Sequence, residues 1–227
     1  DPLKVIDEYG ADAFRFTLTA FAAMGRDIKL SEERIEGYRH FVNKLWNAAR
    51  FALMNLPAEL DAETIKANKD KASGVQHDWI SHRMEELRRT VDTALKGYNF
   101  NEAAQGLYRF TWHEFCDWYL EMIKPEMNGE DQEAKTAAQV RLWSVLRDLL
   151  ILMHPIMPFV TQEIWNSLPG IDQEDIALAA FPEGGDERLN DAAVADMDLL
   201  REVVVAVRNI RGELNIKPSL FLKVSVR

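Results

Sequence analysis

Apolar residues recur at helical spacing through most of the chain. Between 78 and 96, Ile80, Met84, Leu87, Val91 and Leu95 fall at i, i+4, i+7, i+11 and i+15, which places them on one side of a helix. The same periodicity predicts long helices over 31–55, 101–124, 133–153 and 191–214, and shorter ones over 2–9, 11–24 and 158–167. We therefore predict an all-α fold, an antiparallel bundle of long helices joined by short loops.

Four segments depart from this periodicity. Residues 57–75 are polar and predict a mobile linker, and residues 169–190 predict an irregular stretch with an extended piece from Ile176 to Phe181. A turn is expected at Gly25–Ile28. After Pro218, Leu220, Leu222, Val224 and Val226 alternate with other residues, which predicts a short terminal β-strand.

The helix predicted over 31–55 has two unlike sides. On a helical wheel, one arc is apolar and is expected to face the core: Ile35, Tyr38, Val42, Leu45, Ala49, Ala52 and Leu53. The opposite side combines cations, side-chain amides and large rings: Arg39, His40, Asn43, Lys44, Trp46, Asn47, Arg50 and Phe51. From Gly37 onward this helix contains no acidic residue.

That combination is typical of surfaces that read unpaired RNA. Arginine and lysine form charge-assisted hydrogen bonds with phosphate, and asparagine offers both a donor and an acceptor to a base edge. An exposed ring such as Phe51 gives an unpaired base a flat surface for stacking. A second helix covering this side would instead leave Trp46 and Phe51 in a helix–helix contact, and periodicity alone leaves both alternatives open.

Composition narrows the classes of function. The net charge of −10 excludes a protein that coats nucleic acid over its whole surface, although a local basic face remains compatible with specific RNA binding. The single cysteine, Cys116, excludes an internal disulfide and favours a reducing compartment, so we expect a cytoplasmic protein. No apolar run is long enough to cross a membrane, and no membrane partner is expected.

No catalytic or metal site is predicted. A glycine-rich phosphate loop is absent, and no histidine has a glutamate three residues before it. His113 and Cys116 share a helical face, but two ligands from one helix do not form a zinc site, so we expect them to be packed side chains. The first residue is not Met and lies within a helical pattern, which suggests part of a longer polypeptide.

Four segments resemble the valyl-tRNA synthetase family, in the same order. Residues 10–56 are similar to the junction between its catalytic and anticodon-binding domains and contain Gly-Arg-Asp followed by Asn-Lys-Leu-Trp-Asn-Ala. The other three segments read FTWHEFCDWYLEMIKP, HPIMPFVTQEIW and VVVAVRNIRGELNIKP. The resemblance covers essentially the whole chain and weakens at 57–75, 126–140 and 170–190.

The resemblance implies a class I aminoacyl-tRNA synthetase that attaches valine to its tRNA with ATP. It divides the chain into connecting helices at the end of the catalytic domain (1–30), an anticodon-binding bundle (31–190), and a last helix with the start of a C-terminal segment (191–227). The ATP-binding signatures and the editing domain of that family have no counterpart here, so this chain itself needs no cofactor, and ATP and valine belong to the intact enzyme. The implied partners are valine tRNA and the catalytic, editing and coiled-coil domains of the same polypeptide.

The resemblance also implies tRNA-binding residues. Lys44, Arg50 and Phe51 match positions that contact the anticodon in that family, while Arg39, Asn43, Trp46 and Asn47 are added from the helical wheel. The competing hypothesis is a helical protein–protein interaction module that docks a partner helix on the same side. A free-standing hydrolase or metalloenzyme has no motif to support it.

Overall fold

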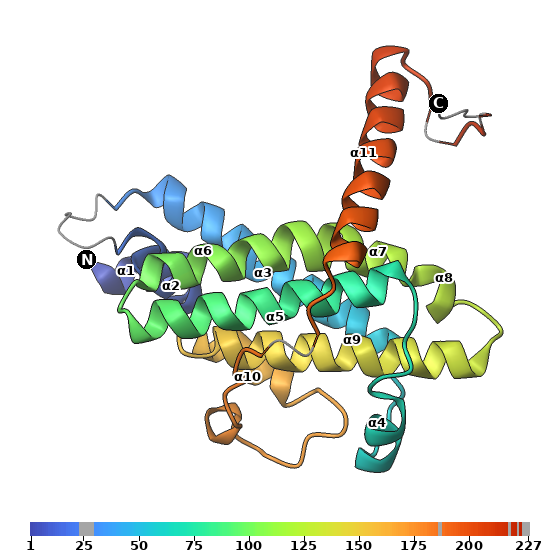
Figure 1. Ribbon diagram of the computed structural model, residues 1–227. Helices are drawn as coiled ribbons and strands as arrows, with labels where there is room; N and C mark the ends of the chain where they lie inside the picture. The colour runs from blue at the N-terminus through green and yellow to red at the C-terminus, as the bar shows by residue number, and fades with distance from the viewer. Residues whose placement is uncertain (23–29, 186–187, 218, 222, 224–227) are drawn as a thin grey trace.

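The computed structural model describes residues 1–22, 30–185, 188–217, 219–221 and 223. These residues form a helical bundle, as predicted (Figure 1). The helices are α1 (Pro2–Tyr9), α2 (Ala11–Phe21), α3 (Glu32–Asn55), α4 (Ala62–Asn68), α5 (Val75–Lys96), α6 (Phe100–Arg109), η1 (Phe110–Tyr119), α7 (Leu120–Met122), α8 (Lys124–Met127), α9 (Gln132–Met153), α10 (Pro158–Trp165), η2 (Ile176–Leu178) and α11 (Asp191–Glu213).

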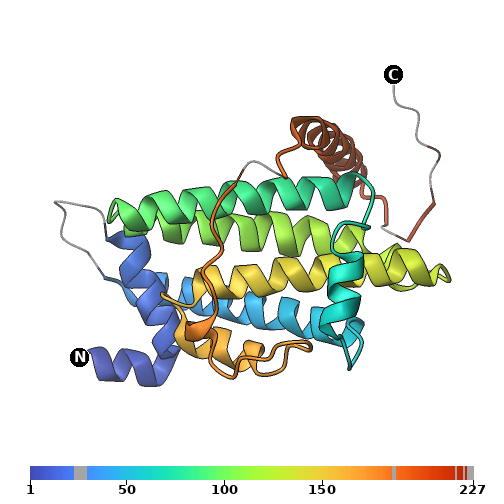
Figure 2. The ribbon, with the colours of Figure 1, turned by 60° about the horizontal axis from the view of Figure 1, so that its bottom comes forward.

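Four long helical rods run side by side along the bundle. They are α3, α5, α9 and the continuous rod formed by α6, η1 and α7 (Figure 2). Helix α3 packs against α2, η1 and α9, and α5 packs against α6, η1 and α9. The short connections between the rods match the antiparallel bundle that the helical periodicity predicts.

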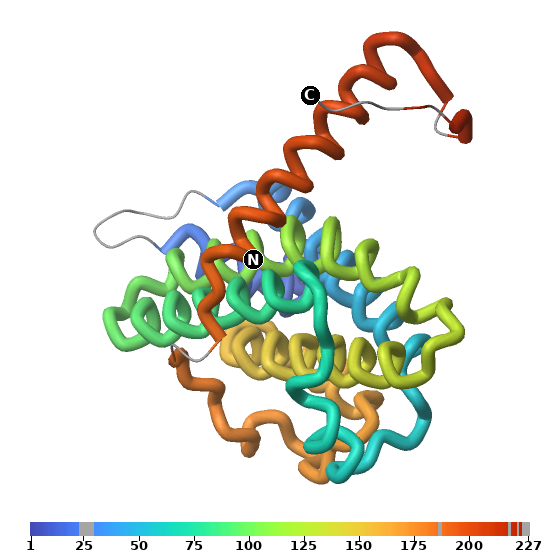
Figure 3. The backbone as a smooth tube through the Cα atoms, turned by 45° about the vertical axis from the view of Figure 1, so that its right-hand side comes forward, coloured from blue at the N-terminus to red at the C-terminus, as the bar shows by residue number. Residues whose placement is uncertain are grey.

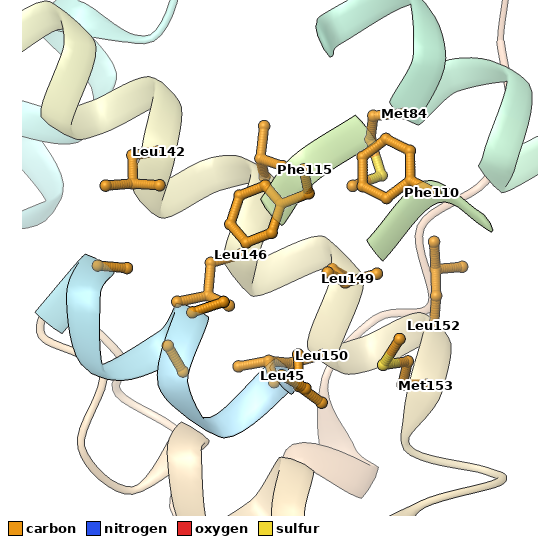
Figure 4. Close-up of a cluster of buried hydrophobic side chains, with 14 of the residues drawn as sticks. Leu45, Met84, Phe110, Phe115, Leu142, Leu146, Leu149, Leu150, Leu152 and Met153 are labelled. Carbon is orange, nitrogen blue, oxygen red and sulfur yellow. The ribbon is translucent and has the colours of Figure 1, made fainter. Parts of the chain in front are cut away.

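Helix α9 runs through the centre of the core. Nearly every residue from Val140 to Met153 is buried, so α9 lacks the solvent-facing side that a surface helix has. Figure 4 shows leucines of α9 meeting Leu45 of α3 on one side and Phe110 and Phe115 on another. These contacts fix α3 in the bundle, because its inner side packs on the central helix.

The N-terminal helices are fastened to the corner between α9 and α10. Arg15 donates hydrogen bonds to the carbonyls of Ile156 and Pro155, each at 2.9 Å. Asp12 accepts hydrogen bonds from the backbone N–H of Val160 at 2.6 Å and of Phe159 at 3.3 Å, at the start of α10. The ring of Phe159 is itself 65% exposed, so backbone hydrogen bonds rather than burial of this ring hold the corner.

The rod formed by α6, η1 and α7 contains an uncommon backbone geometry. Residues 110–119 form a π-helix, in which an N–H donates to the carbonyl five residues earlier rather than four. The N–H of Leu120 accordingly donates to the carbonyl of Phe115. The apolar pattern predicts a single α-helix over 101–124, and this change of hydrogen bonding within it was not foreseen.

Helix α11 projects away from the bundle (Figures 1 and 3). Asn190 caps its N-terminus, and only Ala193 and Met197 of this helix are buried. Beyond them, the guanidinium of Arg201 lies 5.2 Å and that of Arg208 5.6 Å from the ring centroid of Trp118 on η1. These cation–π contacts hold the base of α11 against the rod.

Four sequence predictions need correction or lie beyond the described residues. Residues 57–75 are not a linker, because they contain α4 and the buried side chains of Leu60 and Ala72. The piece predicted as extended at 176–181 begins with the short 3₁₀-helix η2, whose Ile176 is buried. The turn at 25–28 and most of the terminal strand (222, 224 and 226) lie outside the described residues, and the described ones form no strand. Within the described ranges, no helix is both long and apolar enough to cross a membrane.

Candidate nucleic-acid interface

The solvent side of α3 carries five of the seven predicted tRNA-binding residues. These residues, called the outer face from here on, are Arg39, Asn43, Trp46, Asn47 and Arg50, and all five are exposed. Their spacing of i, i+4, i+7, i+8 and i+11 aligns them along one side of the helix. Trp46 is 39% exposed, so a large ring lies between the cations and the amides.

The inner side of α3 is rotated from its predicted position. Phe41 and Ala48 are buried although the predicted apolar arc omits them, whereas Tyr38, Val42 and Leu53 are only half-buried. The reason lies in the packing, because α3 is enclosed between α2, η1 and α9 rather than resting on one neighbour. Phe41 accordingly meets Tyr108 of α6 at a centroid distance of 4.8 Å.

Lys44 lies at the edge of the outer face and contacts η1. Its Nζ donates to Oδ1 of Asp117 at 2.7 Å and lies 4.8 Å from the ring centroid of Trp112. The side chain remains one-third exposed. Asp117 therefore offsets part of the charge that Lys44 would offer to a phosphate.

Phe51 is not the bare ring that the sequence predicts. It is half-buried and packs against the apolar core, and Nζ of Lys124 lies 5.8 Å from its ring centroid. A helical wheel cannot foresee this arrangement, because Lys124 belongs to α8, which is remote in the sequence. Phe51 can therefore present only part of its ring at the edge of the outer face.

Two residues near this surface were missed by the sequence analysis. Met54 extends the outer face by one turn, at four residues after Arg50, and its side chain is 79% exposed. Lys124 borders the face through Phe51 and donates to Oε2 of Glu121 at 2.6 Å. The i+4 spacing would have identified Met54 as exposed, whereas the sequence carries no signal for Lys124.

The outer face also differs from the rest of the chain in charge. Neither Arg39 nor Arg50 forms an ion pair with any other described residue, and α3 has no acid after Glu36. The total charge of −10 is therefore carried by other parts of the molecule. Cations without an ion-pair partner among the described residues and an exposed ring match what a phosphate-and-base surface requires.

The neighbouring Cys116 does not supply reactive chemistry. Burial, as the largest cause, raises the pKa of its thiol to about 12. Nearby His113 lies 3.6 Å from Oδ2 of Asp117. Among the described residues, no group of three or more His, Cys, Asp or Glu side chains is arranged to hold a metal ion.

Comparison with known families decides what this helical bundle is. The profile described as "Anticodon-binding domain of tRNA ligase" matches residues 77–226. The chain belongs to this family. The match to this anticodon-binding domain begins in α5 and extends beyond α11, so it includes three of the four long rods and the projecting helix, whereas α1 to α4 precede it.

Relatives of this anticodon-binding domain are curated as valine–tRNA ligases. The chain is 56% identical over its whole length to the one from Nitratidesulfovibrio vulgaris and 52% identical over 96% of its length to the one from Geobacter sulfurreducens. It spans 25% of each of those proteins, about a quarter of their length. The corresponding protein from Aquifex aeolicus is 40% identical over the whole chain, which covers 20% of it.

A solved structure has the same fold at low sequence identity. It is the LeuRS–tRNA–LeuAMS ternary complex from Agrobacterium radiobacter K84, at a TM-score of 0.59 and 18% identity. The match covers 84% of this chain and 21% of the other. At this identity the likeness establishes the fold of the domain only.

Proposed function

We propose that this domain recognises the anticodon arm of valine tRNA within a valine–tRNA ligase, and that the outer face of α3 makes the contact. The observation that carries the proposal is the outer face itself, where Arg39 and Arg50 flank Trp46 and two asparagines on a stretch of helix that has no acid from Gly37 onward. Two exposed cations can hold phosphates on either side of a base, while the asparagines and the ring contact the base.

The seven predicted residues take different roles in this proposal. Arg39 and Arg50 bind phosphate, and Asn43 and Asn47 offer donors and acceptors to base edges. Trp46 offers a ring for stacking. Lys44 contributes a charge that Asp117 attenuates, and Phe51 supports the edge of the face with the exposed part of its ring.

The remaining activities belong to the intact polypeptide. The relatives' names and the sequence resemblance support a class I ligase that uses ATP to attach valine to its tRNA, with catalytic, editing and coiled-coil domains outside this chain. In this arrangement residues 1–30 connect the bundle to the catalytic domain. The domain itself binds no cofactor, and the enzyme operates in the cytoplasm, where tRNA is charged.

The test is a binding titration of the 227-residue chain with a valine tRNA transcript. Replacing Arg50 or Arg39 with alanine should weaken binding by about 1–3 kcal/mol. The control is Arg109→Ala, which removes an equally exposed arginine from α6, away from the outer face. Equal loss of affinity in Arg109→Ala and Arg50→Ala would refute a localised interface.

Salt dependence distinguishes the proposal from a protein–protein interaction module on the same surface. RNA binding should weaken steeply with rising salt because phosphate contacts release counterions. Arg50→Ala should reduce the slope of log K against log salt by about 1. An unchanged slope would contradict a phosphate contact at Arg50. A transcript with an altered anticodon should bind more weakly than the valine transcript.

A further inference from the structure

Helix α9 contains a buried arginine that, unlike the arginines near it, forms no ion pair with a described residue. Arg141 of α9 is 7% exposed, and its Nε finds no hydrogen-bond acceptor among the described residues. Nearby arginines are paired, Arg88 with Glu85 and Asp148, and Arg188 with Asp70. Arg141 forms no ion pair with any described residue, although a buried charge without a partner is costly.

A cavity of about 240 Å³ adjoins this arginine. Its lining comes from α9, the start of α5, the segment just before α5 and the segment that leads into α11. It includes the cations Arg141 and Arg188, the carboxylates Asp70 and Asp78, and the side chains of Ser81 and Asn190. A smaller space of about 10 Å³, lined by Arg88 and Arg141 among others, is close to the size of one water molecule. The larger cavity has room for a polyatomic ligand.

The lining combines hydrogen-bond donors with acceptors, and one of its carboxylates, Asp70, lies 3.4 Å from the guanidinium of Arg188. Arg141 and Arg188 can only donate hydrogen bonds. The hydroxyl of Ser81 donates its own proton to the carbonyl of His77 at 2.6 Å, so toward the cavity it can only accept. The carboxylate of Asp78 also accepts. Burial, and then the charge of Arg188, lower the pKa of the Arg141 guanidinium, while Tyr119, Asp70 and Asp78 act in the opposite direction.

From this arrangement we infer that the cavity is a binding site for inorganic phosphate, with Arg141 and Arg188 holding its oxygens and Asp78 accepting a hydrogen bond from its remaining O–H. Guanidinium groups match phosphate oxygens in geometry and charge. Hydrogen phosphate keeps one O–H at neutral pH, and this O–H faces an acceptor at Asp78 or Ser81. Sulfate has the same shape but no proton to give, so the carboxylate of Asp78 repels it. A phosphodiester of an RNA backbone also lacks that proton.

Phosphate bound in this cavity would contact the segment that leads into α11. Arg188 and Asn190 line the cavity, and Asn190 is the residue that caps α11 by accepting a hydrogen bond from the N–H of Ala193. Asn190 is also tied to α5, since its N–H donates to Nδ1 of His82 at 2.8 Å. Bound phosphate thus joins α9, α5 and the start of α11 at one point.

The experiment measures binding of sodium phosphate to the 227-residue chain by calorimetry at neutral pH, with ionic strength kept constant by sodium chloride. Sulfate and dimethyl phosphate are titrated in parallel. We expect saturable phosphate binding together with a rise in the midpoint of thermal unfolding, and much weaker binding of the other two anions. No saturable phosphate binding would overturn the inference. Equal binding of dimethyl phosphate would reassign the site to a phosphodiester, and equal binding of sulfate would refute the role of Asp78.

Variants locate the site. Arg188→Gln, which changes a half-exposed side chain and is expected to fold, should weaken phosphate binding at least about tenfold. Arg141→Gln should do the same. Asp78→Asn should let sulfate bind as tightly as phosphate. The matched control is Arg109→Gln, which makes the same change on α6, outside this cavity. Unchanged phosphate affinity in Arg188→Gln would overturn the inference even if Arg141→Gln failed to fold.

Discussion

Lys44 of α3 and Asp117 of η1 form a hydrogen-bonded ion pair with an Nζ–Oδ1 distance of 2.7 Å. The pair fixes the lysine against the π-helical segment and lowers the positive potential at this edge of the outer face. The positive charge of the outer face therefore rests mainly on Arg39 and Arg50, which form no ion pair with a described residue. This relationship leads to the first prediction.

Replacing Asp117 with asparagine should strengthen binding of valine tRNA. The change removes a carboxylate beside Lys44 and leaves its ammonium available to phosphate, which is worth about 0.2–1 kcal/mol for a solvent-exposed pair. The effect should fade in high salt. Filter binding at two salt concentrations measures it, and Lys44→Met/Asp117→Asn serves as the control in which the gain disappears. Weaker binding by Asp117→Asn would mean that the pair is needed to position Lys44.

Two substitutions of Phe51 should separate its contribution to stability from its contribution to RNA binding. Because its ring is half-buried against the core, Phe51→Ala should lower the free energy of unfolding by about 1–3 kcal/mol. Phe51→Leu retains an apolar side chain and should cost less than about 1.5 kcal/mol. If the exposed part of the ring stacks on a base, Phe51→Leu should still weaken tRNA binding by about 1–3 kcal/mol. Urea unfolding and tRNA titration of both variants test this, and wild-type affinity in Phe51→Leu would restrict Phe51 to packing.

Two glycines should respond in opposite directions to alanine. Gly170 has φ +73°, and a Cβ there would collide with the carbonyl oxygen of Leu60, so Gly170→Ala should destabilise the fold by about 1–3 kcal/mol. Gly37 lies within α3 with open space around it, so Gly37→Ala should stabilise by about 0.5–1 kcal/mol. Chemical denaturation measures both. A neutral Gly170→Ala would argue against the close approach of the 170 turn to Leu60.

Cys116 should react slowly with thiol reagents. Burial raises the pKa of its thiol to about 12, so the thiolate fraction at pH 8 is very small. The native chain should label with iodoacetamide far more slowly than the urea-unfolded chain, in which Cys116 has an ordinary pKa. Equal rates in the two states would contradict the burial of this side chain.

Stability should decrease as the solution becomes mildly acidic. His77 is buried, with Nδ1 3.1 Å from the hydroxyl of Tyr119 and Nε2 2.8 Å from Glu126, and burial lowers its pKa. Below its ordinary pKa of about 6.5 the unfolded chain takes up the proton before the folded chain does, so protonation favours unfolding. The loss is at most about 1.4 kcal/mol per pH unit from this group. Urea unfolding between pH 7.5 and 5.5 measures it, and His77→Gln should show a flatter dependence. An identical slope in both proteins would assign the effect to another group.

The helices themselves could be predicted from the sequence because each long helix repeats its own apolar spacing. Helix α5 is an example, where Ile80, Met84 and Val91 are all buried as the spacing requires. On α3 the helical wheel places Arg39, Asn43 and Arg50 opposite the apolar arc, and the structure shows that no second helix covers them. Local spacing therefore predicts which residues share a side of the helix, whereas the packing decides whether that side meets solvent.

The features that the sequence did not reveal depend on contacts between remote segments. Phe51 is covered because α8 brings Lys124 over its ring, and no pattern within α3 encodes that contact. The polar segment at 57–75 is ordered by burying Leu60 and Ala72, two isolated apolar residues that composition does not distinguish from a linker. Arg141 reads as an ordinary helix-surface arginine until α9 proves to be enclosed on all sides.

The π-helical hydrogen bonding of η1 determines how far α7 and α8, which follow it, are rotated about the axis of the rod. Each residue of an α-helix turns the chain by about 100°, so removing one residue between 110 and 119 would let the backbone close into α geometry and swing α7 and α8 around the axis. Lys124 would then leave Phe51, and Glu126 would leave His77. The length of this one segment therefore couples the edge of the outer face on α3 to a buried histidine at the start of α5.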